Sequence, residues 1–247
     1  MNALFSIIIP ALNEEHFIGK LLQALKSQTF QDFEVIVVDA QSNDRTVKVV
    51  KKFQNDFPLK IISTNLRNIS GSRNVGANSA KGEYLFFIDS DNSVFPSFLA
   101  EVRKIIESKK SEMIIPSVVP DSQKAVYKII YSAVNGLVAV SKSLNIAFST
   151  GGNLIIKRDK FEALEGFSEK IFVGEDHDIV KQAIKKKLKI TFMSHPKIIF
   201  SVRRLEKEKF SLILKYFIST MYIVLFGKLT RKIYNYPMGG QYFDKKK

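Results

Sequence analysis

Apolar residues recur along the chain in short runs that alternate with segments of helical spacing. The runs at 4–9, 34–39, 59–64 and 83–89 (LFSIII, EVIVVD, LKIIST and EYLFFID) are rich in β-branched and aromatic residues, which is typical of strands buried in a parallel sheet. Stripes with helical spacing occur at Ile18, Leu21, Leu22 and Leu25, at Val47, Val50 and Phe53, and at Phe98, Leu99, Val102, Ile105 and Ile106. This alternation predicts an α/β fold with helices on both faces of a sheet.

Polar residues follow three of these strands where each is expected to end. PALNEE follows the first, DAQSNDRT the second and DSDN the fourth. Because ligands bind open α/β sheets at the carboxyl ends of the strands, we expect these loops to form one site. Single residues of the loops also have structural interpretations, Asp44 as a helix cap and Asn13 as a turn residue.

Asp89 and Asp91 are two positions apart at a strand exit, so an extended chain directs both carboxylates to one side. Carboxylates that close repel each other unless a cation lies between them. Oxygen ligands of this kind suit Mg²⁺ or Mn²⁺ that takes its other ligands from a diphosphate. The alternative is that Asp91 and Asn92 cap the turn before Pro96.

Arg73 is a charged residue in the first part of a small-residue segment, 68–84 (NISGSRNVGANSAKGEY). Its planar guanidinium matches the oxygens of a diphosphate. A surface ion pair is the alternative.

The composition narrows the class of protein. The chain has 247 residues, 45% of them hydrophobic, and no cysteine, which excludes a disordered chain, disulfides and thiolate metal sites. The N-terminus, MNALFSIIIPALNEE, has no basic leader and runs into acidic sequence, unlike a signal peptide. We therefore expect a first strand there and a cytoplasmic protein.

The net charge of +14 is concentrated towards the C-terminus, where residues 203–247 hold eleven Lys and Arg and three acidic residues, a net +8. Such basicity favours nucleic acid, anionic lipid or nucleotide phosphates as partners. No zinc-finger spacing, RNP-like motif or helix-turn-helix pattern is present, so we expect no nucleic acid.

Two apolar segments predict contact with a membrane. Segment 210–228 (FSLILKYFISTMYIVLFGK) contains Lys215 and falls short of the roughly 20 uninterrupted apolar residues of a span. Its apolar part, 210–226, with basic flanks, predicts either a helix in the membrane interface or a homodimer contact through 206–247. Segment 128–148 is a second candidate for the interface, with a buried helix beside the acceptor site as the equal alternative. We expect the protein at the inner face of the cell membrane, bound peripherally to anionic lipid.

The ordered set SIIIPALNEE, FEVIVVDAQSNDRT, RNVGA and FFIDSDN resembles the family-2 glycosyltransferases, which are inverting, nucleotide-sugar-dependent enzymes of the GT-A fold. The resemblance covers roughly the first hundred residues. It implies a Rossmann-like, mixed but mainly parallel sheet, a UDP- or GDP-sugar donor, and Mn²⁺ or Mg²⁺ held by Asp91. The residues that it places on the nucleotide sugar are Pro10, Ala11, Asn13, Glu14, Asp39, Arg73, Asp89, Ser90 and Asp91.

Two later segments, STGGNLIIKRDKF (149–161) and GFSEKIFVGEDHDIV (166–180), also match this family. They imply an acceptor side and a catalytic carboxylate, for which Asp176 is the candidate because a hydroxyl nucleophile must lose its proton. The alternative for Asp176 is a charge at the N-terminus of a helix beginning near Asp178. The chain has no tryptophan and so lacks the Gln-x-x-Arg-Trp motif of processive synthases, which favours single-sugar transfer. The acceptor-side residues are Gly151, Gly152, Asn153, Glu175, Arg203 and Arg204.

We expect a GT-A domain over 1–205, with a nucleotide-binding half (1–95) and an acceptor half (96–205), followed by a basic and apolar helical appendage (206–247). The expected activity is transfer of one sugar to a hydroxyl of a lipid-linked or glycan acceptor. One alternative is a polyprenyl-phosphate sugar synthase, whose phosphate acceptor needs no strong base. Another is a membrane-bound adaptor without catalysis.

Overall fold

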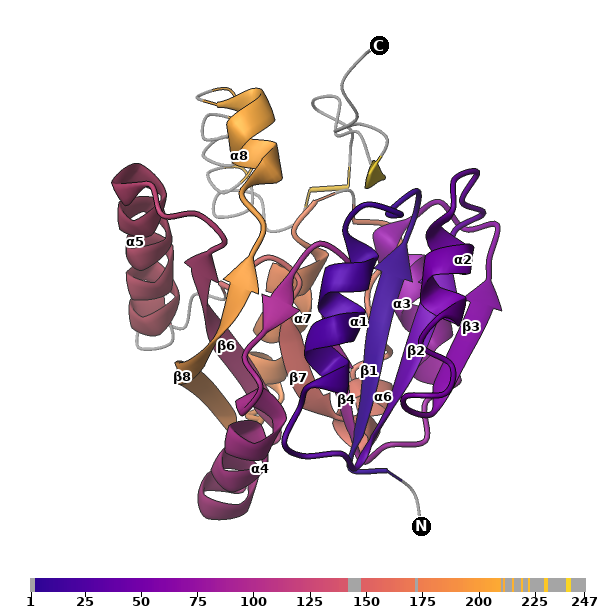
Figure 1. The fold of residues 1–247 in the computed structure, drawn as a ribbon. Coiled ribbons are helices and arrows are strands. Elements are labelled where there is room, and N and C mark those ends of the chain that lie inside the picture. Colours follow the sequence, from indigo (N-terminus) through magenta and orange to yellow (C-terminus); the bar gives the residue numbers. More distant parts are fainter. Residues whose placement is uncertain are drawn as a thin grey trace.

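The computed structural model describes residues 3–141, 148–171 and 173–209, together with residues 211, 215, 219, 222, 229, 230, 239 and 240. Within these residues, one eight-stranded sheet carries helices on both faces, as Figure 1 shows, with the strand order β3-β2-β1-β4-β7-β6-β8-β5. The mixed, mainly parallel α/β sheet that the sequence predicted is confirmed.

The first half of the chain alternates strand and helix. The strands are β1 (Phe5–Ala11), β2 (Phe33–Asp39), β3 (Leu59–Ser63) and β4 (Tyr84–Phe87), and between them lie α1 (Ile18–Lys26), α2 (Thr46–Lys51) and α3 (Ile69–Asn78). All four strands are parallel. Each of the four predicted apolar runs therefore forms a strand.

The second half adds antiparallel pairs. Its strands are β5 (Ser93–Val94), β6 (Met113–Pro120), β7 (Leu154–Lys157) and β8 (Ile190–Phe200), and its helices are α4 (Phe98–Lys109), α5 (Ala125–Ser141), α6 (Arg158–Ala163), α7 (Glu175–Lys185) and α8 (Arg203–Glu208). Strand β7 runs antiparallel to both β4 and β6, while β8 is parallel to β6 and antiparallel to β5. The sheet is thus continuous from one half to the other.

Two apolar clusters lie on opposite faces of the sheet. Alternate residues of β1 point to opposite faces, Ile7 and Ile9 into one cluster and Ile8 into the other. The first cluster takes up all four stripe residues of α1 and, from α4, Phe98, Leu99 and Val102. The stripe predicted for α2 is only partly confirmed, because Val50 is fully buried but Thr46 fills the other buried position and Phe53 is half-buried.

The strand register brings the polar loops to one edge. Ala11, the last residue of β1, pairs with Asp39 at the end of β2, which pairs in turn with Ser63 of β3. These carboxyl ends point to the upper edge in Figure 1, where α8 also lies. The predicted convergence of the loops is therefore confirmed.

Helix α5 differs from one of its two predicted alternatives. Only Tyr131, Val138 and Ser141 of this helix are buried, so the alternative of a buried helix, made for segment 128–148, is wrong over 128–141; residues 142–147 lie outside the described residues. No helix among the described residues is both long and apolar enough to cross a membrane. Most of the segment 210–226 lies outside the described residues.

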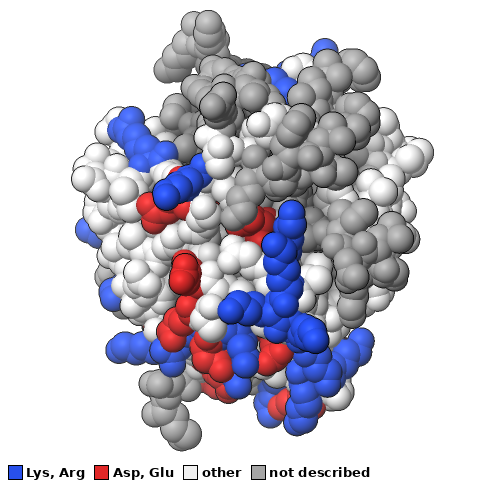
Figure 2. All heavy atoms as spheres, turned by 180° about the vertical axis from the view of Figure 1, so that it is seen from behind, with Lys and Arg blue, Asp and Glu red and all other residues white. Residues whose placement is uncertain are grey.

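Basic and acidic side chains are interleaved over the rear face of the molecule. Figure 2 shows Lys and Arg alternating with Asp and Glu there, without a broad area of one sign.

Candidate functional site

The loops after β1 and β2 are joined to each other by side-chain hydrogen bonds. Asn13 has a positive φ of 53°, so its turn role is confirmed; its backbone N–H donates to Ser42 Oγ at 2.8 Å, and its Oδ1 accepts from the Asn43 N–H at 2.7 Å. Asp44 accepts from the N–H of Thr46 at 2.9 Å, but the N-cap of α2 is Arg45, without a side-chain cap bond, so Asp44 holds the turn that leads into the helix and is not its cap. The loops after β1 and β2 are therefore held together as one unit.

Asp39 is the last residue of β2, beside these joined loops, and is 4% exposed. Its Oδ2 accepts from the Ser42 N–H at 3.1 Å, whereas its Oδ1 is buried and has no hydrogen-bond partner within the described part of the chain. A buried carboxylate oxygen without a partner is costly. Pro10 and Ala11, both buried, form the adjoining strand end. A hydroxyl or amide of a ligand would satisfy Asp39 Oδ1.

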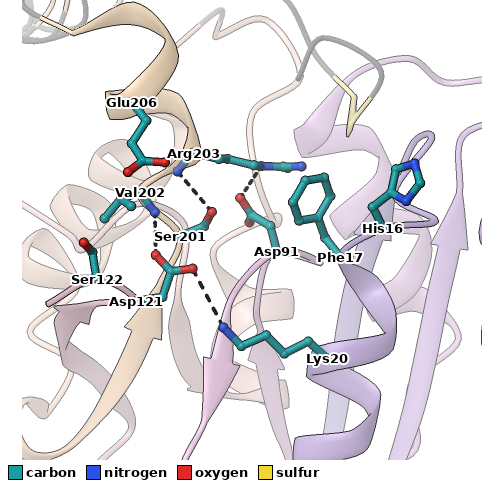
Figure 3. Close-up of a pocket in the computed structure, with 10 residues that line it drawn as sticks. All are labelled: His16, Phe17, Lys20, Asp91, Asp121, Ser122, Ser201, Val202, Arg203 and Glu206. Carbon is teal, nitrogen blue, oxygen red and sulfur yellow. Dashed lines mark hydrogen bonds and ion pairs between the residues drawn. The ribbon is translucent and has the colours of Figure 1, made fainter. Parts of the chain in front are cut away.

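Arg203, the first residue of α8, contacts the carboxylates of Glu14 and Asp91. Its Nη1 and Nη2 donate to the two oxygens of Glu14 at 2.9 and 2.8 Å, its Nε lies 2.7 Å from Asp91 Oδ2, and the guanidinium carbon lies 4.2 Å from the centre of the Phe17 ring. Figure 3 shows the Arg203 side chain running above both Asp91 and the ring of Phe17. Although the sequence placed Arg203 on the acceptor side, it contacts the proposed donor carboxylates, while Arg204 pairs within α8 with Glu208 at 3.4 Å.

The charge state of Glu14 depends on this contact. Burial raises the pKa of Glu14 to about 7, although the hydrogen bonds and charge of Arg203 oppose the rise. The negative charges of Asp91 and Asp89 raise the pKa further. Glu14 therefore titrates near neutral pH.

Arg73 is the largest fully buried side chain among the described residues and joins the two halves of the sheet. Its Nη2 donates to Asp89 at 2.8 Å and its Nη1 to Glu175 at 2.7 Å. Burial opposes its charge, but the two carboxylates outweigh burial and raise its pKa. For the two carboxyl groups, burial raises the pKa of Asp89 and of Glu175, and the charge of Arg73 opposes this rise. Two side-chain nitrogens of Arg73 are therefore hydrogen-bonded to carboxylates of the protein. Its contact with a diphosphate stays a prediction.

Gly152 is required where it lies because of Arg73. Its φ is +78°, and a Cβ atom there would lie 2.1 Å from Arg73 Nη2. Gly151 also has a positive φ, 68°, so only glycine fits this turn without strain. The following Asn153 accepts from Asn92 Nδ2 at 3.0 Å, which fixes the loop of Gly151 and Gly152 to the segment after Asp91.

Asp176 lies in the first turn of α7, which begins at Glu175 and not near Asp178 as predicted. Its Oδ2 accepts from Ser149 Oγ and from the Gly152 N–H (2.8 Å). Its Oδ1 accepts from the N–H of the next residue, His177, at 2.9 Å. Burial raises the pKa of Asp176, but the neighbouring His177, the Ser149 bond and Arg73 outweigh burial and hold the pKa below its usual range. Since a carboxylate has about four acceptor sites, one remains for a ligand.

A hollow of about 290 Å³ opens beside Asp91. Lys20 Nζ lies 3.8 Å from Asp121 across it, and the N–H of Val202 donates to Asp121 at 2.9 Å. Figure 3 shows the lining side chains, which are His16, Phe17, Lys20, Asp91, Asp121, Ser122, Ser201, Val202, Arg203 and Glu206. The hollow therefore lies between α1 and α8, on the Asp91 side of Arg203.

The donor set fits a divalent cation that takes most of its ligands from a substrate. Among the described residues, no group of three or more His, Asp or Glu side chains is arranged to hold a metal. Mg²⁺ in nucleotide sites is usually held by one or two carboxylates plus phosphates, and Asp91, on the open hollow, meets that requirement alone. The Oδ2 atom of Asp91 is paired with Arg203 Nε. A metal ion bound to this oxygen would have to displace the guanidinium or bind the oxygen beside it.

Three features of the site were missed by the sequence interpretation. Phe17 supports Arg203, Ser149 donates to Asp176, and the N–H of Gly240 donates to the Leu12 carbonyl at 2.9 Å. A Cβ on Gly240 would lie 1.9 Å from the Asn13 carbonyl oxygen, so the Gly-Gly pair near the C-terminus was a readable signal of close backbone approach. The roles of Phe17 and Ser149 depend on contacts between distant segments, which local sequence does not show.

Comparison with known proteins decides the family. The family described as "Glycosyl transferase family 2" matches residues 6–165, and that described as "N-terminal domain of galactosyltransferase" matches residues 132–207. The chain belongs to glycosyl transferase family 2. The resemblance carried by the four N-terminal motifs is therefore confirmed.

Individual family-2 relatives agree with this assignment. The poly(ribitol-phosphate) β-N-acetylglucosaminyltransferase TarS of Staphylococcus aureus is 36% identical over 115 residues, which are 45% of this chain and 20% of TarS. The crystal structure of TarS 1–349 in complex with UDP superposes with a TM-score of 0.64 and 23% identity over 82% of this chain and 61% of that one. The structure of the mannosyltransferase PcManGT of Pyrobaculum calidifontis, in complex with GDP-Man and Mn²⁺, superposes with a TM-score of 0.67 and 19% sequence identity. The match covers 82% of this chain and 58% of PcManGT. These structures share the GT-A fold, and the chain matches only a fifth of the length of TarS.

Proposed function

We propose that this family-2 protein transfers one sugar from a nucleotide diphosphate sugar to an acceptor hydroxyl, with inversion at the anomeric carbon. The observation that carries the proposal is the bridge made by Arg73, which contacts Asp89 at 2.8 Å and Glu175 at 2.7 Å. One side chain thereby joins the donor-side carboxylates to the Glu175–Asp176 pair. An acceptor positioned at Asp176 would therefore lie next to a donor positioned at Asp91.

The residues have separate tasks in this reaction. The unpartnered Oδ1 of Asp39 binds a polar group of the nucleoside, with Pro10, Ala11, Asn13 and Glu14 around it. A divalent cation, Mn²⁺ or Mg²⁺, held by Asp91 would supply positive charge to the diphosphate as its bond to the sugar breaks. Arg73, Asp89 and Ser90 complete the donor side.

Displacement needs a base on the acceptor side. The Asp176 carboxylate takes the proton of the acceptor hydroxyl, whose oxygen bonds to the anomeric carbon while the bond from that carbon to the diphosphate breaks. The lowered pKa of Asp176 keeps it ionised, which is the form that a base requires. Gly151, Gly152 and Asn153 shape the acceptor loop, and Glu175 is held by Arg73.

The acceptor that we propose is a hydroxyl of a glycan, polyol-phosphate or lipid-linked chain at the inner face of the cell membrane. The name of TarS refers to poly(ribitol-phosphate), and the net charge of +14 suits phosphate-rich partners. We retain the division into a GT-A domain (1–205) and an appendage (206–247) as part of this proposal. A homodimer through 206–247 is the alternative role of the appendage.

The test replaces Asp176 by Asn and measures transfer from UDP-GlcNAc and GDP-Man with Mn²⁺ present. We expect kcat to fall by at least ~100-fold, the usual scale for loss of a general base, while the dissociation constant of the nucleotide, measured by calorimetry, stays unchanged. Asp178→Asn is the matched control, because Asp178 is equally buried on the same helix and pairs with Gln182 at 2.9 Å. Full turnover by Asp176→Asn would make Asp176 a helix-end charge and overturn the proposed mechanism.

A further inference from the structure

The loop 149–152 holds the Asp176 carboxylate by one of its two oxygens. Within the described residues, Asp176 Oδ2 accepts from the Ser149 hydroxyl and, at 2.8 Å, from the Gly152 N–H. Asp176 Oδ1 accepts a single bond from these residues, that of the His177 N–H at 2.9 Å. Each carboxylate oxygen has about two acceptor sites. Both sites of Oδ2 are therefore occupied by the protein, and the open site belongs to Oδ1.

The neutral His177 ring does not use this open site. Its Nδ1 accepts from the Ser149 backbone N–H at 3.1 Å, which places the ring proton of a neutral imidazole on Nε2. The same Nδ1 lies 3.7 Å from Asp176 Oδ1, beyond hydrogen-bond distance. Phe148 packs edge-to-face on the ring, with 5.4 Å between the ring centres. The lone pair of Oδ1 is therefore left for a ligand.

The single proton of the Ser149 hydroxyl is directed to Asp176. Ser149 Oγ lies 3.4 Å from His177 Nδ1 and much closer to Asp176 Oδ2. An ionised carboxylate is also the stronger acceptor of the two. Ser149 is 5% exposed, so water does not compete for this bond. The hydroxyl of Ser149 therefore fixes the rotation of the Asp176 carboxylate.

We propose that Ser149 is a positioning residue, which orients Asp176 so that Oδ1 is the oxygen that receives the proton of the acceptor. The inference rests on the proposed function, in which Asp176 is the base. The proton of the acceptor hydroxyl moves to Oδ1, and the electron pair left on the hydroxyl oxygen forms the bond to the anomeric carbon. The diphosphate leaves with the electron pair of the bond that breaks. Without the Ser149 hydroxyl, the carboxylate is free to turn and Oδ2 has an open site of its own.

Charged groups also face Asp176 and are left in place when Ser149 is replaced. They are Glu175 and His177 on α7, Arg73 on α3 and Asp89 after β4. The loop 149–152 adds hydrogen bonds but no charge. A change in the titration of Asp176 on replacing Ser149 therefore reports the hydroxyl bond.

The first measurement is an NMR titration of the full chain with ¹³C-labelled aspartate carboxyl groups, in which the signal of Asp176 is the one that Asp176→Asn removes. We expect Ser149→Ala to raise the titration midpoint of Asp176 by about one to two pH units, because the anion loses a charge-assisted hydrogen bond. Ser149→Thr keeps a hydroxyl and should titrate as the wild type does. Thr150→Val is the matched control, because it removes a buried hydroxyl of the same loop that donates to the Pro116 carbonyl at 2.7 Å.

The second measurement is hydrolysis of UDP-GlcNAc and GDP-Man with Mn²⁺ present, where water takes the place of the acceptor. We expect kcat of Ser149→Ala to fall at least ~10-fold, because the base is no longer held in the productive geometry. The KM for the donor should stay unchanged, since Ser149 bonds only to the acceptor side. Thr150→Val should change neither the midpoint nor kcat.

Three outcomes would overturn the proposal. An unmoved midpoint in Ser149→Ala would mean that the hydroxyl does not act on Asp176. Equal shifts in Ser149→Ala and Thr150→Val would reflect a disturbed loop, and a raised midpoint with wild-type kcat would mean that the bond does not orient the base. Failure of the proposed function gives a different result, full turnover by Asp176→Asn, and the titration is read without any turnover.

Discussion

At the scale of single residues, Arg203 links the end of the sheet to its beginning. Its guanidinium satisfies both oxygens of Glu14 and one oxygen of Asp91, and it covers the ring of Phe17. The same Asp91 oxygen is the expected ligand of a divalent cation. Arg203 therefore neutralises Glu14 and Asp91, and on the proposed function it would compete with a divalent cation for Asp91.

Replacing Arg203 by Gln tests this competition. We expect Mn²⁺ to bind about tenfold more tightly in the absence of nucleotide, because a charge-assisted bond of roughly 1.5–3 kcal/mol no longer has to be replaced. Mn²⁺ binding is measured by electron paramagnetic resonance or calorimetry. Arg204→Gln, on the same helix but paired with Glu208, should bind Mn²⁺ as the wild type does. Weaker Mn²⁺ binding by Arg203→Gln would show that Arg203 organises Asp91 and does not compete.

Glu14 gives the stability of the fold a pH dependence. Its pKa is about 7 in the folded state against an ordinary 4.5 for a glutamate in the unfolded chain, so its protonated form favours folding. The contribution is full below pH 4.5 and is lost as the pH rises through 7. The free energy of unfolding of the wild type, relative to Glu14→Gln, should therefore fall by about 1–3 kcal/mol between pH 5 and pH 7.5. Urea unfolding of both proteins at the two pH values measures it, and a constant difference would refute the raised pKa.

At the scale of elements, α3 packs against the sheet through a glycine. A Cβ on Gly76 would lie 2.5 Å from Ile8 Cγ2 and 3.1 Å from Val38 Cγ2, and both side chains belong to the cluster under α3. The close approach also holds Arg73, one turn earlier in α3, beneath the site. The position of Arg73 therefore depends on the small residue that lets the helix approach.

Gly76→Ala should lower the free energy of unfolding by about 1–3 kcal/mol, because the added methyl group overpacks the buried sheet face. Gly19→Ala is the matched control in α1, where the nearest atom to a new Cβ, Val49 Cγ1, is 3.4 Å away. Since alanine is the better helix former, that change should stabilise by about 0.5–1 kcal/mol. Denaturant unfolding of both variants measures the contrast, and equal effects would mean that α3 adjusts without cost.

At the scale of the whole molecule, one sheet runs through both proposed halves of the GT-A domain. β4 pairs with β7, and β5, which lies within the 1–95 half, pairs with β8 at the far edge. The carboxyl edge carries the donor loops and α8, while α5 stands at the side of the molecule, beyond β6 (Figure 1). Helix α5 and the proposed donor site are thus on separate surfaces of the molecule.

The sequence by itself determined the elements and the edge at which they present chemistry. Runs such as EVIVVD and the stripe from Ile18 to Leu25 identify strands and helices because burial imposes a period of two or 3.6 residues. The alternation of strand and helix implied a parallel sheet, and a parallel sheet brings its loops together at the carboxyl ends. Asp39, Asp89 and Asp91 could therefore be placed near one another from spacing alone.

Only the tertiary structure decided which charges meet. Arg73 and Glu175 are 102 positions apart, and Glu14 and Arg203 are 189 apart; the order of strands in the sheet brings each pair together, and no local period encodes that order. The orientation of α5 was also beyond the sequence, because an apolar helix shows the same pattern whether its outer face meets protein or lipid. Its exposure follows from where β6 holds it, through the two bonds between Asn135 and Val118.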